Sequence, residues 1–320
     1  MYVKSIDYAK CTACMLCQSI CANSRVIASN AEGKPEFRHD IRCIYCGHCL
    51  AVCPQGAITF TAAPDCAARD AAYYAETVER AAGCAAIPAE DVFDFLSATR
   101  SSRIFLRRPV ERGKLETVLD AMVRSASAGN EQNRNFRVLT HPETLDQIEQ
   151  NLKEYYDQKV KLINNPASRA LHSFVTAFRT GKQAVPAGTP RLSFAKRYHA
   201  AQSMLKEILP GPALSFSYLK QAPALILITR GKRNGRMHRA FYRGDACIAA
   251  TYGILMAKAL GLASCWIGLL QIALSQNKRL GALLGLKPGE QLDAAVAVGY
   301  SEITWHRLPP RGPVEITWME

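Results

Sequence analysis

Apolar residues follow two kinds of pattern along the C-terminal part of the chain. Helical spacing predicts one amphipathic helix that presents Leu115, Val118, Leu119, Met122 and Val123 on one face. Short apolar runs at residues 136–140, 224–229 and 294–298 are typical of strands. Residues 245–260 are apolar nearly all round and stop at Gly261, which predicts a buried helix with a glycine terminator. This mixture of helices and strands indicates an α+β domain.

The patterning divides the chain into three parts. Residues 1–62 are short-stranded and punctuated by cysteines, and we expect them to form a separate small domain. Residues 63–90 are rich in alanine and predict a helical linker. Residues 91–320 form the α+β domain, in which residues 146–218 are polar and helix-prone. We expect that region to be a helical excursion, because a structureless loop of this length is uncommon.

Composition and hydropathy bound the class of protein. Of the 320 residues, 48% are hydrophobic and 21% are charged, which excludes wholesale disorder. No apolar secretory core follows Met1, so we expect a cytoplasmic protein. Residues 251–270 come nearest to a membrane span, but Lys258 and Gly261 within them favour a buried helix that leads into a strand. We therefore expect no membrane association.

The formal net charge of +13 resembles that of nucleic-acid-binding proteins. The basic residues are nevertheless dispersed along the chain, apart from short groups such as Arg107-Arg108 and Lys232-Arg233. Anionic cofactors or an acidic partner protein account for the excess of positive charge equally well. We expect no nucleic acid as a partner.

Eight of the twelve cysteines lie between Cys11 and Cys53 in two runs of equal spacing. Disulfides are a poor explanation in the reducing cytoplasm, so the clustering indicates a metal site. In such Cys-x2-Cys-x2-Cys-x3-Cys runs, three thiolates hold one [4Fe-4S] cluster and the fourth binds the other cluster. One cluster is therefore expected on Cys11, Cys14, Cys17 and Cys53. The second is expected on Cys43, Cys46, Cys49 and Cys21.

A pair of zinc sites is the alternative, since four thiolates also suit zinc. Zinc motifs usually present cysteines in pairs, whereas here runs of four are doubled and the second ends in Cys53-Pro54. The first sixty or so residues resemble a bacterial-type two-cluster ferredoxin, with Ala22 after Cys21 as a departure in the loop.

Two segments of the second domain carry groups suited to a phosphate and to a heterocycle. Residues 97–105 contain Arg100, Ser101, Ser102 and Arg103, which can bind a terminal phosphate, although a solvated basic turn has the same composition. Residues 125–133 combine small residues with carboxamides that can bond the edge of a flat ring, although a polar loop would look alike.

Together with three further segments, these resemble the nitroreductase family of FMN-dependent oxidoreductases. The matching segments, in order, are Arg100 to Phe105, Asn130-Glu131-Gln132, Gly261 to Gly268, Val298-Gly299-Tyr300 and Arg307 to Arg311. The sequence departs from the family pattern near Ser127 and at Asn133, where the family often has proline, and in the long excursion.

The resemblance implies a site for FMN and a homodimer. Its phosphate would be bound by Arg100, Ser101, Ser102, Arg103 and Arg311, with Arg307 as a further candidate. The ring edge would contact Asn130 and Gln132, and the backbone at Ile267 and Gly268 would face the redox centre of the ring. No catalytic side chain is assigned, because solvent can protonate the product.

Two functions follow from this domain pair. In the first, electrons pass from the two clusters to FMN and on to a small-molecule acceptor such as a nitroaromatic, a quinone or an activated alkene. NAD(P)H, a ferredoxin or a flavodoxin would be the electron donor. In the second, the chain is an electron-transfer module that relays electrons between a redox carrier and a partner protein.

Overall fold

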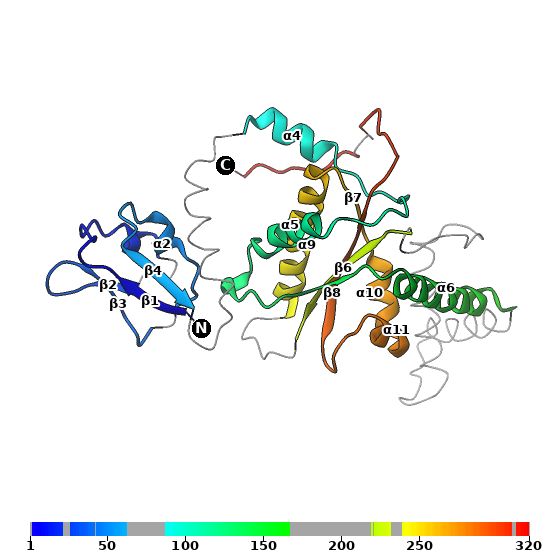
Figure 1. Cartoon of the computed structure of the whole chain (residues 1–320), viewed down its shortest axis with the longest axis horizontal. Coiled ribbons are helices and arrows are strands. Elements are labelled where there is room, and N and C mark those ends of the chain that lie inside the picture. The colour runs from blue at the N-terminus through cyan, green and yellow to red at the C-terminus, as the bar shows by residue number, and fades with distance from the viewer. Residues whose placement is uncertain are drawn as a thin grey trace. The chain divides into compact units, whose positions relative to one another are not determined.

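The computed structural model of the chain divides into two compact units (Figure 1). One unit comprises Met1–Phe95 with Ser127–Gln132, and the other comprises Leu96–Ala126 with Asn133–Glu320. The helix α4 (Ala89–Ser97) spans the boundary along the chain. The structure describes residues 2–21, 26–41, 43–62, 87–166, 219, 221–231, 239–308 and 312–319. The predicted linker at residues 63–90 lies outside the described residues as far as residue 86.

The first unit contains two small antiparallel sheets and two one-turn helices, as the short-stranded pattern predicts. Its elements are β1 (Tyr2–Ile6) paired with β4 (Ile58–Ala62), β2 (Ile27–Ser29) paired with β3 (Pro35–Phe37), α1 (Leu16–Ser19) and α2 (His48–Val52). The turn between β2 and β3 is closed by Asn30, whose side chain accepts hydrogen bonds from the backbone N–H groups of Glu32 and Lys34. The few buried apolar residues pack around the thiols of Cys17 and Cys49.

A four-stranded antiparallel sheet forms the centre of the second unit. The strands lie in the order β5-β6-β8-β7 and comprise β5 (Asn135–Leu139), β6 (Ala224–Arg230), β7 (Ala263–Trp266) and β8 (Gln291–Gly299). β6 and β8 occupy the middle and are buried on both faces, which explains their continuous apolar sequences. The three strands predicted from the apolar runs are confirmed.

Two helices, α5 (Arg112–Val123) and α9 (Arg239–Ala259), cover one face of this sheet. α5 is the predicted amphipathic helix, and Leu115, Val118 and Met122 are its buried residues. α9 begins earlier than predicted, and the chain turns after it at Gly261, whose φ is 71°. α9 is packed against the sheet, as expected of a buried helix, and its exposed apolar side chains include Phe241, Ile248 and Tyr252.

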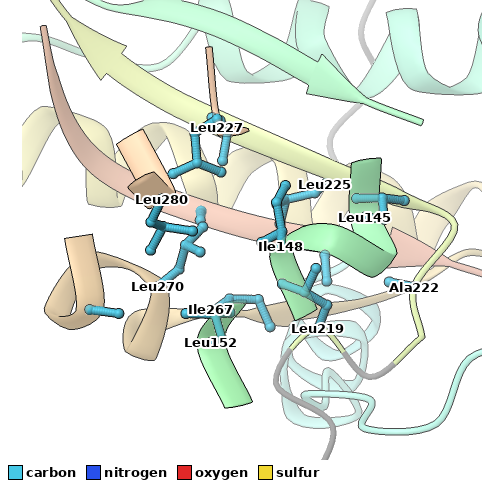
Figure 2. Packing of buried hydrophobic residues seen from close by; sticks show 14 of the residues in the cluster. Leu145, Ile148, Leu152, Leu219, Ala222, Leu225, Leu227, Ile267, Leu270 and Leu280 are labelled. Carbon is cyan, nitrogen blue, oxygen red and sulfur yellow. The ribbon is translucent and has the colours of Figure 1, made fainter. Parts of the chain in front are cut away.

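The other face is covered by α6 (Pro142–Asn164), α10 (Gly268–Leu274) and α11 (Lys278–Leu283). Figure 2 shows Ile148 of α6 beside Leu225 of the sheet and Leu152 of α6 beside Ile267. The excursion expected from residue 146 thus begins with a helix of the domain core, and residues 167–218 lie outside the described residues. In the part of the chain that is described, no helix is long and apolar enough to cross a membrane.

We expect Gly299→Ala to destabilise the second unit. A Cβ atom at Gly299 would lie 2.5 Å from Cδ of Pro223 and 3.0 Å from a ring carbon of Phe105, and the proline ring cannot move aside as a flexible side chain would. The free energy of unfolding should fall by about 1–3 kcal/mol, the usual cost of overpacking. Thermal unfolding followed by circular dichroism measures the change.

The matched control is Gly113→Ala in α5. A Cβ atom there would meet nothing within 4 Å, and alanine favours the helix by up to about 1 kcal/mol. If Gly299→Ala were as stable as Gly113→Ala, the close approach of Pro223 to β8 would be incorrect.

Candidate functional site

The two cysteine runs fold into loops of the same backbone geometry. Ala13 and Met15 in the first run have φ values of 54° and 57°, and the matching positions Tyr45 and Gly47 in the second have 53° and 77°. α1 and α2 begin directly after Met15 and Gly47. Alternation of right- and left-handed residues turns successive backbone N–H groups towards one point, a concavity found at phosphate and iron–sulfur sites. Both loops are therefore shaped to hold an anionic group.

Each loop borders a cavity lined by four cysteines. The first cavity is lined by Cys11, Cys14, Cys17 and Cys53. The second is lined by Cys21, Cys43, Cys46 and Cys49. In both cavities three thiols come from one run and the fourth comes from the other, and these are the two ligand sets predicted from the spacing. Four thiols in apolar surroundings fit an iron–sulfur cluster.

Burial sets the acidity of the innermost thiols. Desolvation raises the pKa of Cys17, and it raises the pKa of Cys49 to about 11. Since the thiolate is the metal ligand, metal binding must displace these protons. Backbone N–H groups already point at one sulfur of each set, with Ala57 N donating to Cys53 Sγ at 3.3 Å and Tyr45 N donating to Cys43 Sγ at 3.3 Å. Such N–H···S bonds help to set the reduction potential of a cluster.

No three cysteine, histidine, aspartate or glutamate side chains among the described residues are grouped so that they could hold a single metal ion. The thiols are instead spaced around the two cavities.

The predicted phosphate segment lies beside β7 in the second unit. Ser101 forms a parallel bridge with Ser264, and Ser102 N donates to the carbonyl oxygen of Ser264 at 2.8 Å. The Ser102 side chain is buried, and its hydroxyl donates to Ile104 O at 3.0 Å and lies 3.3 Å from Ser301 Oγ. Ser102 thus fixes the segment locally, while Ser101 and Arg103 are exposed.

A polar cavity of about 200 Å³ opens next to this segment. It brings Arg100 and Ser102 together with Ser264, Ser301 and the ammonium of Lys258 near the end of α9. The pKa of Lys258 is lowered first by burial and then by the neighbouring positive charge of Arg100. Two cations beside hydroxyl groups form a site for a phosphate or another anion.

Lys258 was not among the predicted site residues. The one feature of the sequence that points to Lys258 is that it is a single lysine in the last turn of a largely apolar helix. Nothing in the local sequence pairs that lysine with Arg100, which precedes it by more than 150 residues.

Asn130 and Gln132 belong to the first compact unit, within the segment Ser127–Gln132. Asn130 Nδ2 donates to the carbonyl oxygens of Ile44 at 3.0 Å and Tyr45 at 2.8 Å. Gln132 Nε2 donates to Asn130 Oδ1 at 3.0 Å, and both residues have left-handed backbones with φ of 51° and 47°. The carboxamides are thus oriented by the protein, and their contact with a ring edge stays a prediction.

The remaining predicted residues lie at the end of β7 and in the C-terminal segment. Ile267 is buried, and its N–H donates to Ala295 O of β8 at 2.9 Å, so the backbone at Ile267 and Gly268 is fixed to the sheet edge where α10 begins. Arg307 is exposed, and Arg311 lies outside the described residues.

We expect cysteine substitutions to group by cavity rather than by run. Cys21→Ala should remove the same cluster as Cys46→Ala, although Cys21 stands in the first run, and Cys53→Ala should remove the same cluster as Cys14→Ala. Each variant should retain about four of about eight iron atoms per chain. Iron analysis and electron paramagnetic resonance of the reduced proteins measure the content and identify the remaining cluster.

The control for this series is Cys247→Ala, which removes a half-buried thiol of α9 outside both cavities and should keep all the iron. Identical resonance signatures for Cys21→Ala and Cys14→Ala would contradict the crossed ligand sets.

Removal of either cation from the polar cavity should weaken binding of a phosphate-bearing ligand. Arg100→Gln or Lys258→Gln should raise the dissociation constant for FMN by about tenfold, the usual effect of losing a charge-assisted hydrogen bond. Fluorescence titration of flavin-free protein measures this constant. Lys278→Gln on the exposed surface of α11 is the matched control and should leave it unchanged. Equal affinities in all three variants would exclude this cavity as the phosphate site.

Comparison with known proteins matches both parts of the chain. A segment of 62 residues is 36% identical to the ferredoxin-type protein NapH of Haemophilus influenzae, covering 18% of this chain and 22% of NapH. A segment of 60 residues is 35% identical to NADH-quinone oxidoreductase subunit I 2 of Geobacter metallireducens, covering 17% of this chain and 46% of that subunit. The chain thus spans less than half the length of either curated relative.

Solved structures of similar fold include a nitroreductase from Bacteroides fragilis with bound FMN, at 18% identity and a TM-score of 0.48, covering 72% of this chain and 98% of that one. Another is the FMN-dependent nitroreductase NfnB from Mycobacterium smegmatis in complex with NADPH, at 15% identity and a TM-score of 0.43, covering 70% and 95%. Residues 10–58 match the model of the 4Fe-4S dicluster domain, and residues 96–300 match that of the nitroreductase family. Because the second match takes in well over half of the sequence, the chain belongs to the nitroreductase family and carries a 4Fe-4S dicluster domain ahead of the family's own domain.

Proposed function

We propose that this chain is an iron–sulfur flavoprotein oxidoreductase that passes electrons from two [4Fe-4S] clusters to FMN and on to a small organic acceptor. The observation that carries the proposal is the pair of four-thiol cavities on the same chain as a nitroreductase domain. We assign the dicluster domain to residues 1–62 and the flavin domain to residues 91–320, joined by residues 63–90.

When bound, the clusters supply single-electron transfer, and FMN supplies exchange between single electrons and electron pairs. The protein contributes the surroundings of these groups. Apolar residues line both cavities and bury Cys17 and Cys49, and the N–H groups of Tyr45 and Ala57 donate to the sulfurs of Cys43 and Cys53. Arg100 and Lys258 would hold the FMN phosphate in the polar cavity and balance its negative charge.

The acceptor is a nitroaromatic, a quinone or an activated alkene, all of which take electron pairs from a reduced flavin. We assign no side chain as a proton donor, because water at an open site can protonate the product. Direct reduction by NAD(P)H and delivery by a ferredoxin or flavodoxin are the two routes for electrons to enter.

The functional form is a homodimer. Phe241, Ile248 and Tyr252 expose 50%, 41% and 46% of their surface along one side of α9, although this helix is otherwise packed on the sheet. Near the C-terminus, Val314, Ile316 and Trp318 are also exposed and alternate with polar residues, as in a strand that pairs with another surface. Exposed apolar surface of this kind supports contact with a second copy.

The net charge favours a second candidate function, a relay to or from an acidic protein. A formal charge of +13 attracts a negatively charged carrier such as a flavodoxin over a long range. In that case the acceptor is a protein and the flavin converts between one-electron and two-electron transfer.

We expect the anaerobically reconstituted protein to hold about eight iron atoms and about one FMN per chain. After reduction with dithionite and removal of the excess dithionite, the protein should be reoxidised when it is mixed with a nitroaromatic, a quinone or an activated alkene. Stopped-flow absorbance follows the clusters and the flavin separately. A protein that binds FMN but is reoxidised by none of the three classes would contradict the enzyme function.

The dependence of the reduction rate on ionic strength separates the two candidate functions. Reduction by an acidic carrier should slow steeply between about 50 and 500 mM salt, because charge screening removes the attraction between the proteins. Reduction by NADPH should change much less, because docking of a protein is not involved.

A further inference from the structure

Arg134 is the half-buried arginine that follows the segment Ser127–Gln132 and precedes β5. Its guanidinium bonds residues of the second unit that precede that segment in the chain. Nη1 donates to Ser125 Oγ at 2.8 Å and Ala126 O at 3.0 Å, and Nη2 donates to Ser125 O at 2.9 Å. Longer bonds of 3.4 Å run to Val123 O and to Asp245 O.

These partners make Arg134 a cap for the end of α5. Val123 is the last residue of α5, and carbonyl oxygens at a helix C-terminus lack partners within the helix. A cation there is favoured by the negative end of the helix dipole. Ser125 is buried, and its hydroxyl donates to Met122 O at 2.8 Å while it accepts from Arg134, so the serine and the arginine hold each other in place.

The fifth bond ties this cap to α9. Asp245 is a buried residue of α9, its carbonyl oxygen accepts from Arg134, and its negative charge favours the charged form of the guanidinium. Burial by itself lowers the pKa of Arg134, so the side chain is held at a cost in solvation that its five bonds offset. One side chain thus joins α5, α9 and the start of β5.

We propose that Arg134 is a positioning residue that fixes both ends of the segment Ser127–Gln132. The second unit is interrupted by the segment between Ala126 and Asn133. Arg134 bonds the carbonyl oxygen of Ala126 and is the next residue after Asn133, so it lies at both ends of the segment. The inference rests on the proposed function, in which Asn130 and Gln132 of this segment contact the flavin ring. Arg134 therefore holds the points at which the segment joins the second unit, while the carboxamides themselves are held by the bonds of Asn130 to Ile44 and Tyr45 and of Gln132 to Asn130.

The fork of the guanidinium is necessary for this role. Two nitrogens address the carbonyl and the hydroxyl of one residue, Ser125, together with three further carbonyl groups. A lysine at the same position would present a single ammonium and could satisfy only some of these acceptors. Arg134→Lys should therefore keep the positive charge but recover little of the affinity for FMN.

The test compares Arg134→Met with Arg137→Met. Arg137 lies three residues further along the chain, in β5, is also half-buried, and bonds Leu284 O at 3.2 Å and the carboxylate of Glu290 at 3.2 Å. Both changes remove a packed guanidinium and its bonds. Arg134→Met should raise the dissociation constant for FMN by about tenfold or more, and Arg137→Met should change it by less than about twofold.

Two further measurements separate positioning from general loss of structure. At saturating FMN, the visible circular dichroism of the bound flavin should change in Arg134→Met and match the wild type in Arg137→Met, because that signal reports the surroundings of the ring. Iron content should stay at the wild-type level in both variants, and where Arg134→Met fails to fold, Arg134→Lys takes its place.

Failure of the proposed function and failure of the role of Arg134 give different results. Wild-type protein that binds no FMN would overturn the proposed function. Wild-type protein that binds FMN while Arg134→Met and Arg134→Lys keep its affinity and its circular dichroism would overturn the role of Arg134 and leave the proposed function intact.

Discussion

The exchange of one thiol between the two cysteine runs is the constraint on which the first unit depends. Cys53 lines the cavity of the first run and Cys21 lines that of the second, so neither cavity is complete unless both runs are folded. Within the described residues, the apolar core of this unit is small and includes the thiols of Cys17 and Cys49. Because thiols from both runs line each cavity, metal ligation contributes folding free energy to this unit.

The second unit is stabilised in the ordinary way, by a sheet with helices on both faces, and its site depends on that scaffold. The polar cavity combines Arg100 from the segment beside β7 with Lys258 from the end of α9 and Ser264 from β7 itself. Two neighbouring cations repel each other, and partial burial also lowers the pKa of Lys258. The packing of the sheet and α9 therefore keeps the two positive charges close together before a ligand binds. A bound phosphate would reduce the repulsion between them.

Features of the structure that depend on neighbouring residues could be predicted from the sequence more fully than features that depend on contacts between distant residues. The apolar periodicity of α5 and the apolar runs of β6 and β8 depend only on neighbouring residues, and the spacing of the cysteines already contains the sets that line each cavity. The role of Lys258 could not be predicted, because it depends on a contact with a segment far away in the chain. The apolar face of α6 was hidden in a polar composition, since buried residues such as Ile148 and Tyr156 are separated by charged ones.

The left-handed residues of the cysteine loops carry a consequence for how the protein is made in a cell. Ala13, Met15 and Tyr45 adopt this conformation without being glycine, at a cost of about 1–2 kcal/mol each. Ligation of a cluster by the neighbouring thiols would offset that cost. Chains synthesised under iron limitation would therefore complete their C-terminal portion and leave the N-terminal portion open to proteolysis, so that the amount of working protein follows nutrient supply as well as gene expression.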